Sequence, residues 1–268
     1  MNNIWTNDNY ISPLQFLIDI PIQEFDLTKA NINVLRDADA ISEEQYQYLY
    51  HCPKHERSVT IGKMQGRDNR ITQILKEGIA NARKVFILSN NILDKDILAI
   101  RNDAITIIGD KNITNLRVTD RVNFELEGSY RSFYRINFLH MYYNYDLVSK
   151  TEVLDIKGLG DFGVEIHNNY FMDFLRELFY TAQIEGVDNA LHLLAIFYNN
   201  YIMGNLDINY YRELNPQSMF KLNPILRTQT LYVNDASEGD RAYINTMYNE
   251  QILREFNRIY SSIYFGTK

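Results

Sequence analysis

The spacing of hydrophobic residues changes along the chain and predicts where strands and helices alternate. In residues 12–27 apolar and polar positions alternate, as in half-buried strands, and Pro21 divides the stretch. From Thr28 the apolar spacing becomes three and four, which predicts a helix ending near residues 37–40. Ser42 then has the side chain of a helix N-cap, with glutamates in the first turn of a second helix.

The longest early helix is predicted over residues 67–91, where apolar side chains recur every three or four positions. It leads into residues 96–110, where two short β-branched runs flank the tripeptide Arg101-Asn102-Asp103. This pattern predicts a hairpin with the tripeptide at its turn. Asn and Asp are ordinary turn residues. An acid at a hairpin tip is also suited to holding a metal ion, and the local pattern leaves both interpretations open.

The second half of the chain contains further strand patterns and then helical ones. Strand patterns cover residues 116–126, 131–145 and 153–158, and helical patterns cover residues 168–183, 187–203 and 239–263. The aromatic residues in 131–145 favour a core, although aromatic side chains can also stack on nucleic-acid bases.

The predicted fold class is α/β in the broad sense, or α+β. We expect a palm-like mixed or antiparallel sheet with packed helices, followed by a mainly α-helical C-terminal part. The expected division is an α/β core over residues 1–150 and a helical part over residues 151–268.

Composition identifies a globular protein, because 46% of the 268 residues are hydrophobic. No apolar run reaches the roughly 18–20 residues of a membrane helix, and residues 1–11 lack the features of a signal peptide. The single cysteine, Cys52, excludes an internal disulfide and fits a reducing compartment. The sequence therefore predicts a cytoplasmic protein without membrane contact.

Charge is distributed unevenly along the chain. The net charge of −7 argues against a protein that coats nucleic acid. Residues 1–50 contain eight acidic and two basic side chains, whereas residues 54–84 contain eight basic and three acidic ones. The basic segment is either a solvated helix face or a surface that holds phosphate beside a carboxylate-bound metal.

Asp26 stands where a predicted strand gives way to a helix, so its carboxylate should project at the strand's end. The helix N-terminus that follows offers free backbone N–H groups suited to phosphate. If this strand neighbours the predicted hairpin, Asp26 and Asp103 can lie side by side. Such a carboxylate pair suits Mg²⁺, which takes its remaining ligands from water and substrate phosphate.

These elements resemble, in their order, the palm of right-handed nucleic-acid polymerases. Residues 26–35, DLTKANINVL, are similar to the first palm motif of family-A DNA polymerases. Residues 63–66, KMQG, are similar to the Gln-Gly element of that family, and residues 98–107 take the place of its metal-binding hairpin. Residues 154–158, LDIKG, with the helical pair after them, resemble the Lys-Gly strand and thumb of family-B polymerases.

The resemblance implies a reduced or split polymerase palm that performs two-metal nucleotidyl transfer. Asp26 and Asp103 would bind Mg²⁺ and act in catalysis, and Asn31 would occupy the position that screens the sugar. The implied contacts to phosphate or to the nucleic-acid backbone are Lys29, Arg57, Lys63 and Lys157. Nucleotide and nucleic acid would be ligands, and a protein partner or a second copy of the chain would complete the molecule.

The sequence also departs from these families. At the hairpin only Asp103 is acidic, where the families carry a second acid, and the fingers helix has no full counterpart. An alternative is therefore a catalytically inactive, polymerase-derived phage protein with a structural or inhibitory role, bound to a protein or to nucleic acid. A third possibility is an unrelated α/β protein. The many Asn, Ile and Tyr residues fit a gene from an AT-rich genome such as that of a phage.

Overall fold

The computed structural model describes residues 3–14, 16–136, 139–157, 169–203 and 205–206. Helices and antiparallel sheets together make an α+β fold, which confirms the predicted class. The chain divides into two compact units. Unit 1 comprises residues 1–13 and 21–129, and unit 2 comprises residues 14–20 and 130–268. The division expected at residue 150 falls inside unit 2, in the turn between two paired strands.

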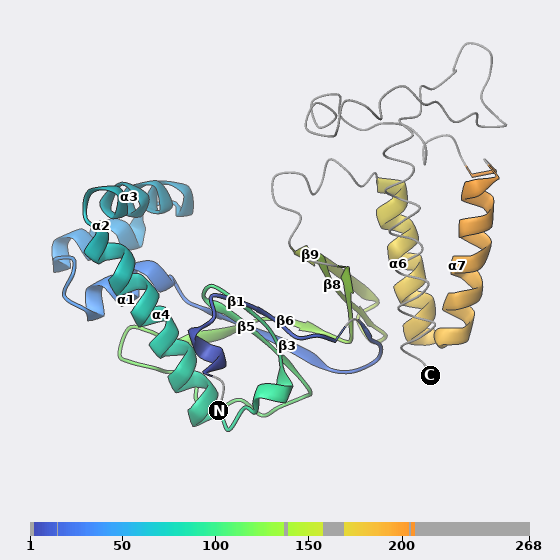
Figure 1. Cartoon of the computed structure of the whole chain (residues 1–268), viewed down its shortest axis with the longest axis horizontal. Coiled ribbons are helices and arrows are strands. Elements are labelled where there is room, and N and C mark those ends of the chain that lie inside the picture. Colours follow the sequence, from blue (N-terminus) through green and yellow to red (C-terminus); the bar gives the residue numbers. More distant parts are fainter. Residues whose placement is uncertain (1–2, 15, 137–138, 158–168, 204, 207–268) are drawn as a thin grey trace, which may run out of the picture. The chain divides into compact units, whose positions relative to one another are not determined.

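Unit 1 is built on a five-stranded sheet with the strand order β1-β4-β5-β3-β6 (Figure 1). Its strands are β1 (Asn9–Ile11), β3 (Ile22–Leu27), β4 (Ile97–Arg101), β5 (Ala104–Ile108) and β6 (Phe124–Tyr130). The predicted hairpin is present as β4 and β5, and β3 pairs antiparallel with β5. Consequently the strand that carries Asp26 near its end lies directly beside the hairpin that carries Asp103.

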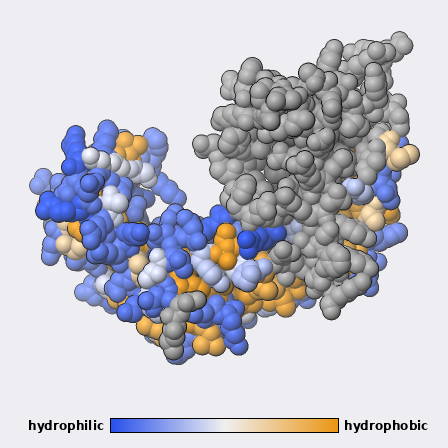
Figure 2. Space-filling model, viewed as in Figure 1, coloured by the Kyte–Doolittle hydropathy of each residue, from blue (hydrophilic) through white to orange (hydrophobic). Residues whose placement is uncertain are grey.

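Four α-helices connect β3 to the hairpin, and short 3₁₀ turns precede β1 and β4. The helices are α1 (Ala30–Asp37), α2 (Glu43–His51), α3 (Lys54–Arg67) and α4 (Asn69–Ser89), and the turns are η1 (Ile4–Thr6) and η2 (Asp94–Asp96). Phe86 of α4 joins the helix to the sheet, because its ring centroid lies 5.3 Å from that of Phe25 and 4.2 Å from that of Phe124. In Figure 2 the surface formed by α2 and α3 is mostly hydrophilic.

Local sequence explains the helix boundaries. The Ser42 hydroxyl accepts from the Gln45 N–H, and the Gln45 side chain accepts from the Ser42 N–H, which makes a complete capping box. The Asp68 side chain caps α4 by accepting from the Arg70 N–H. The predicted helix over residues 67–91 corresponds to α4, but no helix was predicted over α3, because α3 buries a single side chain, Ile61, and so lacks a strong apolar stripe.

One predicted strand is largely wrong. Of residues 116–126, only the last three belong to β6, and Arg117 and Asn123 form an isolated bridge. The chain turns back between them, where the N–H groups of Val118 and Thr119 both donate to the Val122 carbonyl. The alternating pattern thus marks two flanks of a turn rather than one extended strand.

Unit 2 has its own four-stranded sheet, in the order β2-β7-β8-β9, with two helices. These elements are β2 (Phe16–Leu17), β7 (Ser132–Ile136), β8 (Leu139–Asp146), β9 (Thr151–Lys157), α6 (Asn169–Ile184) and α7 (Val187–Ile202). The aromatic run proves to be core: Phe133, Tyr142 and Tyr143 are completely buried. Phe179 of α6 stacks on Tyr143 at 5.6 Å. The predicted helix over residues 239–263 lies outside the described residues.

No helix in the described part of the chain is both long enough and apolar enough to cross a membrane.

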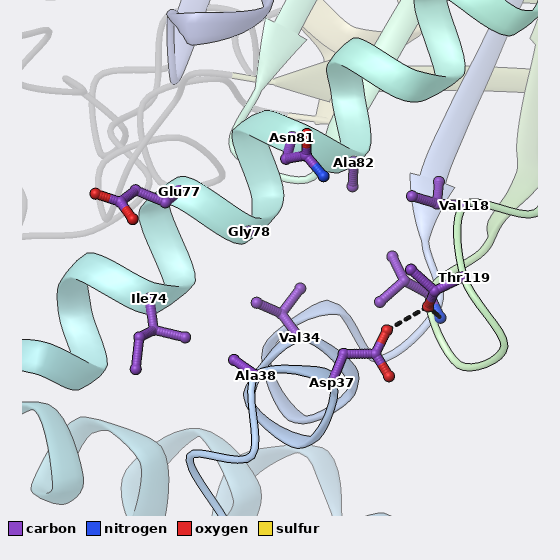
Figure 3. A pocket seen from close by; sticks show the side chains of 11 residues that line it. Val34, Asp37, Ala38, Ile74, Glu77, Gly78, Asn81, Ala82, Val118 and Thr119 are labelled. Carbon is purple, nitrogen blue, oxygen red and sulfur yellow. Dashed lines mark hydrogen bonds between the residues drawn. The ribbon is translucent and has the colours of Figure 1, made fainter.

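The crossing of α1 and α4 is unusually close at Gly78 (Figure 3). A Cβ atom added there would lie 2.3 Å from Cγ1 of Val34. We expect Gly78→Ala to lower the free energy of unfolding by about 2 kcal/mol or more, because the two helices would have to move apart. Val34→Ala in the same background should recover part of that loss. Chemical denaturation measures both effects.

Gly62 in α3 offers the matched control, since a Cβ atom there meets no atom within 4 Å. Gly62→Ala should stabilise the protein by about 0.5–1 kcal/mol, because alanine restricts the unfolded chain and favours helix. Equal effects of the two substitutions would contradict the close helix crossing.

Candidate functional site

Asp26 and Asp103 lie at the same end of neighbouring strands. In the β3–β5 pairing Phe25 is opposite Ile105, so the next residue, Asp26, comes level with Ala104, at the start of β5. Asp103 immediately precedes that position, in the turn between β4 and β5. The fold therefore brings together two acids that are far apart in the sequence.

The carboxyl group of Asp26 lies in an environment that disfavours its charge. Burial, with the negative charges of Asp103 and then Glu127, raises its pKa from 3.8 to about 6. A hydrogen bond from the Leu27 N–H acts in the opposite direction. The Oδ1 atom is buried and has no hydrogen-bond partner in the described structure. A buried acceptor without a donor is costly, and a cation or a proton would satisfy it.

Glu127 of β6 is a third acid near Asp26 that sequence reasoning missed. Phe124 of the same strand belongs to the core, and side chains alternate between the faces of a strand. Glu127, an odd number of positions away, is therefore on the face opposite the core. Phe25 is also core, so Asp26 is on that opposite face as well. The alternation was readable in the sequence, but the adjacency of β6 to β3 was not.

The donor set is small for a metal site. Among the described residues, no group of three His, Cys, Asp or Glu side chains is placed to hold a metal ion. Two carboxylates nevertheless fit Mg²⁺, which proteins commonly hold through one or two acids while water and phosphate oxygens complete the octahedron. The unpartnered Oδ1 atom of Asp26 fits this use.

The geometry of the turn explains why Asn and Asp occupy the hairpin tip. Arg101 pairs with Ala104, so Asn102 and Asp103 alone form the turn. Asn102 has a φ of +49°, in the left-handed region, which asparagine tolerates better than most residues. Asn102 thus meets the conformational demand of the turn, and the carboxylate of Asp103 is left to line a cavity.

That cavity has a volume of about 400 Å³, within the range of small-molecule sites. Residues from five parts of unit 1 line it: Asp8, Asn31, Gln65, Thr72, Leu75, Lys76, Ile79, Asn102 and Asp103. It therefore joins the acidic tip to Asn31, in the first turn of α1, and to Gln65 of the KMQG segment. Lys76 is the basic residue among them.

A fully buried arginine holds the hairpin tip beside this cavity. Arg83 of α4 donates from Nη1 to the Asn102 carbonyl and from Nη2 to Oδ1 of Asp8, the latter at 2.9 Å. Its Nε donates to the Trp5 carbonyl at 2.9 Å. The Asn102 N–H in turn donates to the Asp8 carbonyl at 2.7 Å.

The other predicted site residues have different surroundings. Nζ of Lys29 donates to the Tyr50 carbonyl at 3.1 Å and lies over the Tyr50 ring. Arg57 and Lys63 are on α3 and are not among the residues that line the cavity. Lys157, on β9 in unit 2, lies 3.3 Å from Asp155. Their proposed contacts with phosphate stay predictions.

Sequence reasoning chose Arg57 and Lys63 from the basic segment but passed over Lys76 and Arg83. Helical spacing contained the signal. Thr72, Lys76 and Arg83 follow one another at intervals of four and seven, which places them on one side of a helix. That side of α4 faces the cavity and the hairpin tip.

A second cavity, of about 360 Å³, lies between α1, α4 and the loop after β5 (Figure 3). Val34, Ile74 and Val118 make it largely apolar, and the Asp37 carboxylate at its edge accepts from the Thr119 hydroxyl. Its described lining contains none of the predicted site residues and no basic side chain. The first cavity is therefore the better candidate for a phosphate-bearing ligand.

Comparison with known proteins gives a family. The model of the bacteriophage PBS1 gene 130 protein family matches residues 1–255, which include both units. The chain belongs to this family. Its phage origin agrees with the interpretation drawn from composition. A search of curated proteins finds no match.

The raised pKa of Asp26 makes a testable prediction about this phage protein. The folded state keeps its proton up to about pH 6, whereas the unfolded chain loses it near 3.8. The contribution of Asp26 to stability should therefore fall as pH rises through that window and stay level above it. Asp26→Asn removes the charge. It should be more stable than wild type by about 3 kcal/mol at pH 7 and nearly equal to it below pH 4, by denaturation at each pH.

Glu125→Gln is the control, because Glu125 is an exposed acid on β6, near Glu127 in sequence. It should change stability by less than about 0.5 kcal/mol at every pH. If wild type and Asp26→Asn show parallel stability curves from pH 4 to pH 7, Asp26 is not in a charge-disfavouring site.

Proposed function

We propose that this phage protein is a palm-like subunit of a reduced or split nucleic-acid polymerase that performs nucleotidyl transfer. The observation that carries the proposal is the convergence of Asp26 and Asp103 at one end of adjacent strands, with a buried oxygen of Asp26 unpartnered. A cavity of about 400 Å³ that is lined by Asp103, but not by Asp26, adds to it. The order of elements that resembles a polymerase palm gives the reaction class.

In this proposal the two acids hold a divalent cation, Mg²⁺. When bound, this cation supplies positive charge that stabilises the transferring phosphoryl group. Asp26 fixes one side of the site from the rigid end of β3, and Asp103 fixes the other from the turn of the hairpin. Because Asp26 carries a raised pKa, it gains most from a cation, which would allow it to ionise fully.

The substrate in this proposal is a nucleotide that occupies the cavity. Lys76 supplies a positive charge for its phosphates, and Asn31 and Gln65 supply polar side chains for its sugar or base. The first N–H groups of α1, which begins at Ala30, donate no hydrogen bond to the side chain of the N-cap residue, Lys29. They are therefore suited to a phosphate oxygen.

A second candidate function is binding without catalysis. It is favoured by the small donor set, because no three-residue metal cluster exists among the described residues. In that case the same acids and cavity would serve recognition of a protein or nucleic-acid partner, in a structural or inhibitory role. Activity measurements separate the two candidates.

Primer extension with Mg²⁺ and with Mn²⁺ tests catalysis directly. We expect the wild type to extend a primer, and Asp26→Asn and Asp103→Asn each to lower the rate by about 100-fold or more, because each removes a cation ligand. Glu125→Gln should retain the wild-type rate. If the wild type is inert yet still binds a partner as tightly as both variants do, the binding function replaces the catalytic one.

Nucleotide binding tests the cavity separately from the chemistry. Lys76→Ala should weaken the binding of a nucleoside triphosphate about tenfold, because it removes a charged contact to phosphate.

If α3 tracks the nucleic-acid backbone, Arg57→Ala with Lys63→Ala should instead lower nucleic-acid affinity and reduce its salt dependence by about one unit of slope for each charge. Unchanged binding across a salt series would assign the α3 charges to solubility.

A further inference from the structure

We infer that Arg83 is a positioning residue for the hairpin tip: together with Asp8 it fixes the peptide that carries Asp103 relative to Asp26. This inference rests on the proposed function for its purpose, but the contacts that carry it are independent of any ligand. They join Arg83 to η1, to the residue before β1 and to the β4–β5 turn, which lie 78, 75 and 19 positions from Arg83 in the sequence.

The hydrogen bonds hold both sides of one turn residue. Arg83 donates to the Asn102 carbonyl, and the Asn102 N–H donates to the Asp8 carbonyl at 2.7 Å. The Asn102 carbonyl belongs to the planar peptide group that leads into Asp103. Fixing that plane fixes the N and Cα atoms of Asp103, and the pairing of Arg101 with Ala104 restrains the other side of the turn.

The hydrogen bonds that join Arg83 and Asp8 to Asn102 form a clamp on the hairpin tip, and the arginine of this clamp is deeply buried. Its side chain is completely buried, at 0% exposure. A buried guanidinium costs free energy unless it is paired and hydrogen-bonded. Here it is matched by two carbonyl groups and one carboxylate, all fixed by the fold. An apolar residue would fill the same space at lower cost in desolvation but would leave the tip without its donors.

Asp8 connects this clamp to the cavity. One oxygen of its carboxylate accepts from Arg83, and the other lies 4.0 Å from Nζ of Lys76. Both Asp8 and Lys76 line the cavity with Asp103. The charged groups that hold the hairpin tip are therefore connected to those that a ligand in the cavity would contact.

The test uses the full chain with two substitutions of Arg83. Arg83→Met removes every donor from the buried site, whereas Arg83→Lys keeps the charge but loses the planar fork that reaches three acceptors. Ile87→Ala is the matched control, since Ile87 is equally buried on α4 and loses only apolar contacts. Thermal unfolding of each variant reports on general stability.

Two readouts separate positioning from general stability. Hydrogen exchange at the amides of residues 101–104 reports on the tip, and Mn²⁺ binding measured by calorimetry reports on the acid pair. In Arg83→Lys we expect exchange at the tip to rise more than at the centre of β3, and the Mn²⁺ dissociation constant to increase about tenfold. Arg83→Met should show a larger effect. Ile87→Ala should lower the melting temperature but leave Mn²⁺ affinity within about twofold of wild type.

The outcomes distinguish this inference from the proposed function. A folded Arg83→Lys protein with wild-type exchange at the tip overturns the clamp, even if the wild type binds Mn²⁺. If the wild type binds no Mn²⁺, the proposed function fails, while selective exchange at residues 101–104 in Arg83→Lys still supports the clamp. Equal loss of Mn²⁺ affinity in Ile87→Ala and Arg83→Lys also overturns it, because the effect would then follow general stability.

Discussion

The candidate site depends on one structural constraint, the antiparallel pairing of β3 with β5. Register matters as much as adjacency, because a slip by one residue would turn Asp26 toward the core and Phe25 away from it. The ring of Phe25 against Phe86 opposes such a slip. The apolar core thus helps to fix the positions of two acidic side chains.

Helix α4 serves the core and the candidate site at once. Phe86 anchors it to the sheet, and Gly78 lets α1 approach closely enough to bring Asn31 to the cavity. On another side, Lys76 and Arg83 reach the cavity and the hairpin tip. Since one rigid helix carries all four residues, a shift of α4 that disturbed the core would also disturb the cavity and the tip.

Local signals in the sequence predicted most elements of unit 1, but not how the site is assembled. The capping box of Ser42, the periodicity of α4 and the β-branched hairpin each act over a few residues, so they were readable. Strand order is a long-range property that local patterns do not reveal. The closeness of Asp26 to Asp103 could therefore be predicted only on the assumption that their strands are neighbours, and Glu127 was missed. Arg83 was missed for a similar reason, because its partners lie in segments that only the fold brings together.

The energetics of Asp26 explain why such a site needs a clamp. Burial and three neighbouring acids raise its pKa to about 6, so the ionised form of Asp26 is disfavoured in the fold near neutral pH. Repulsion between the acids would be relieved if the turn moved Asp103 away from β3. The hydrogen bonds from Arg83 and to Asp8 oppose that movement. Loss of one of the acids would relieve this repulsion, so the retention of both is consistent with the proposed role of the pair in binding a cation.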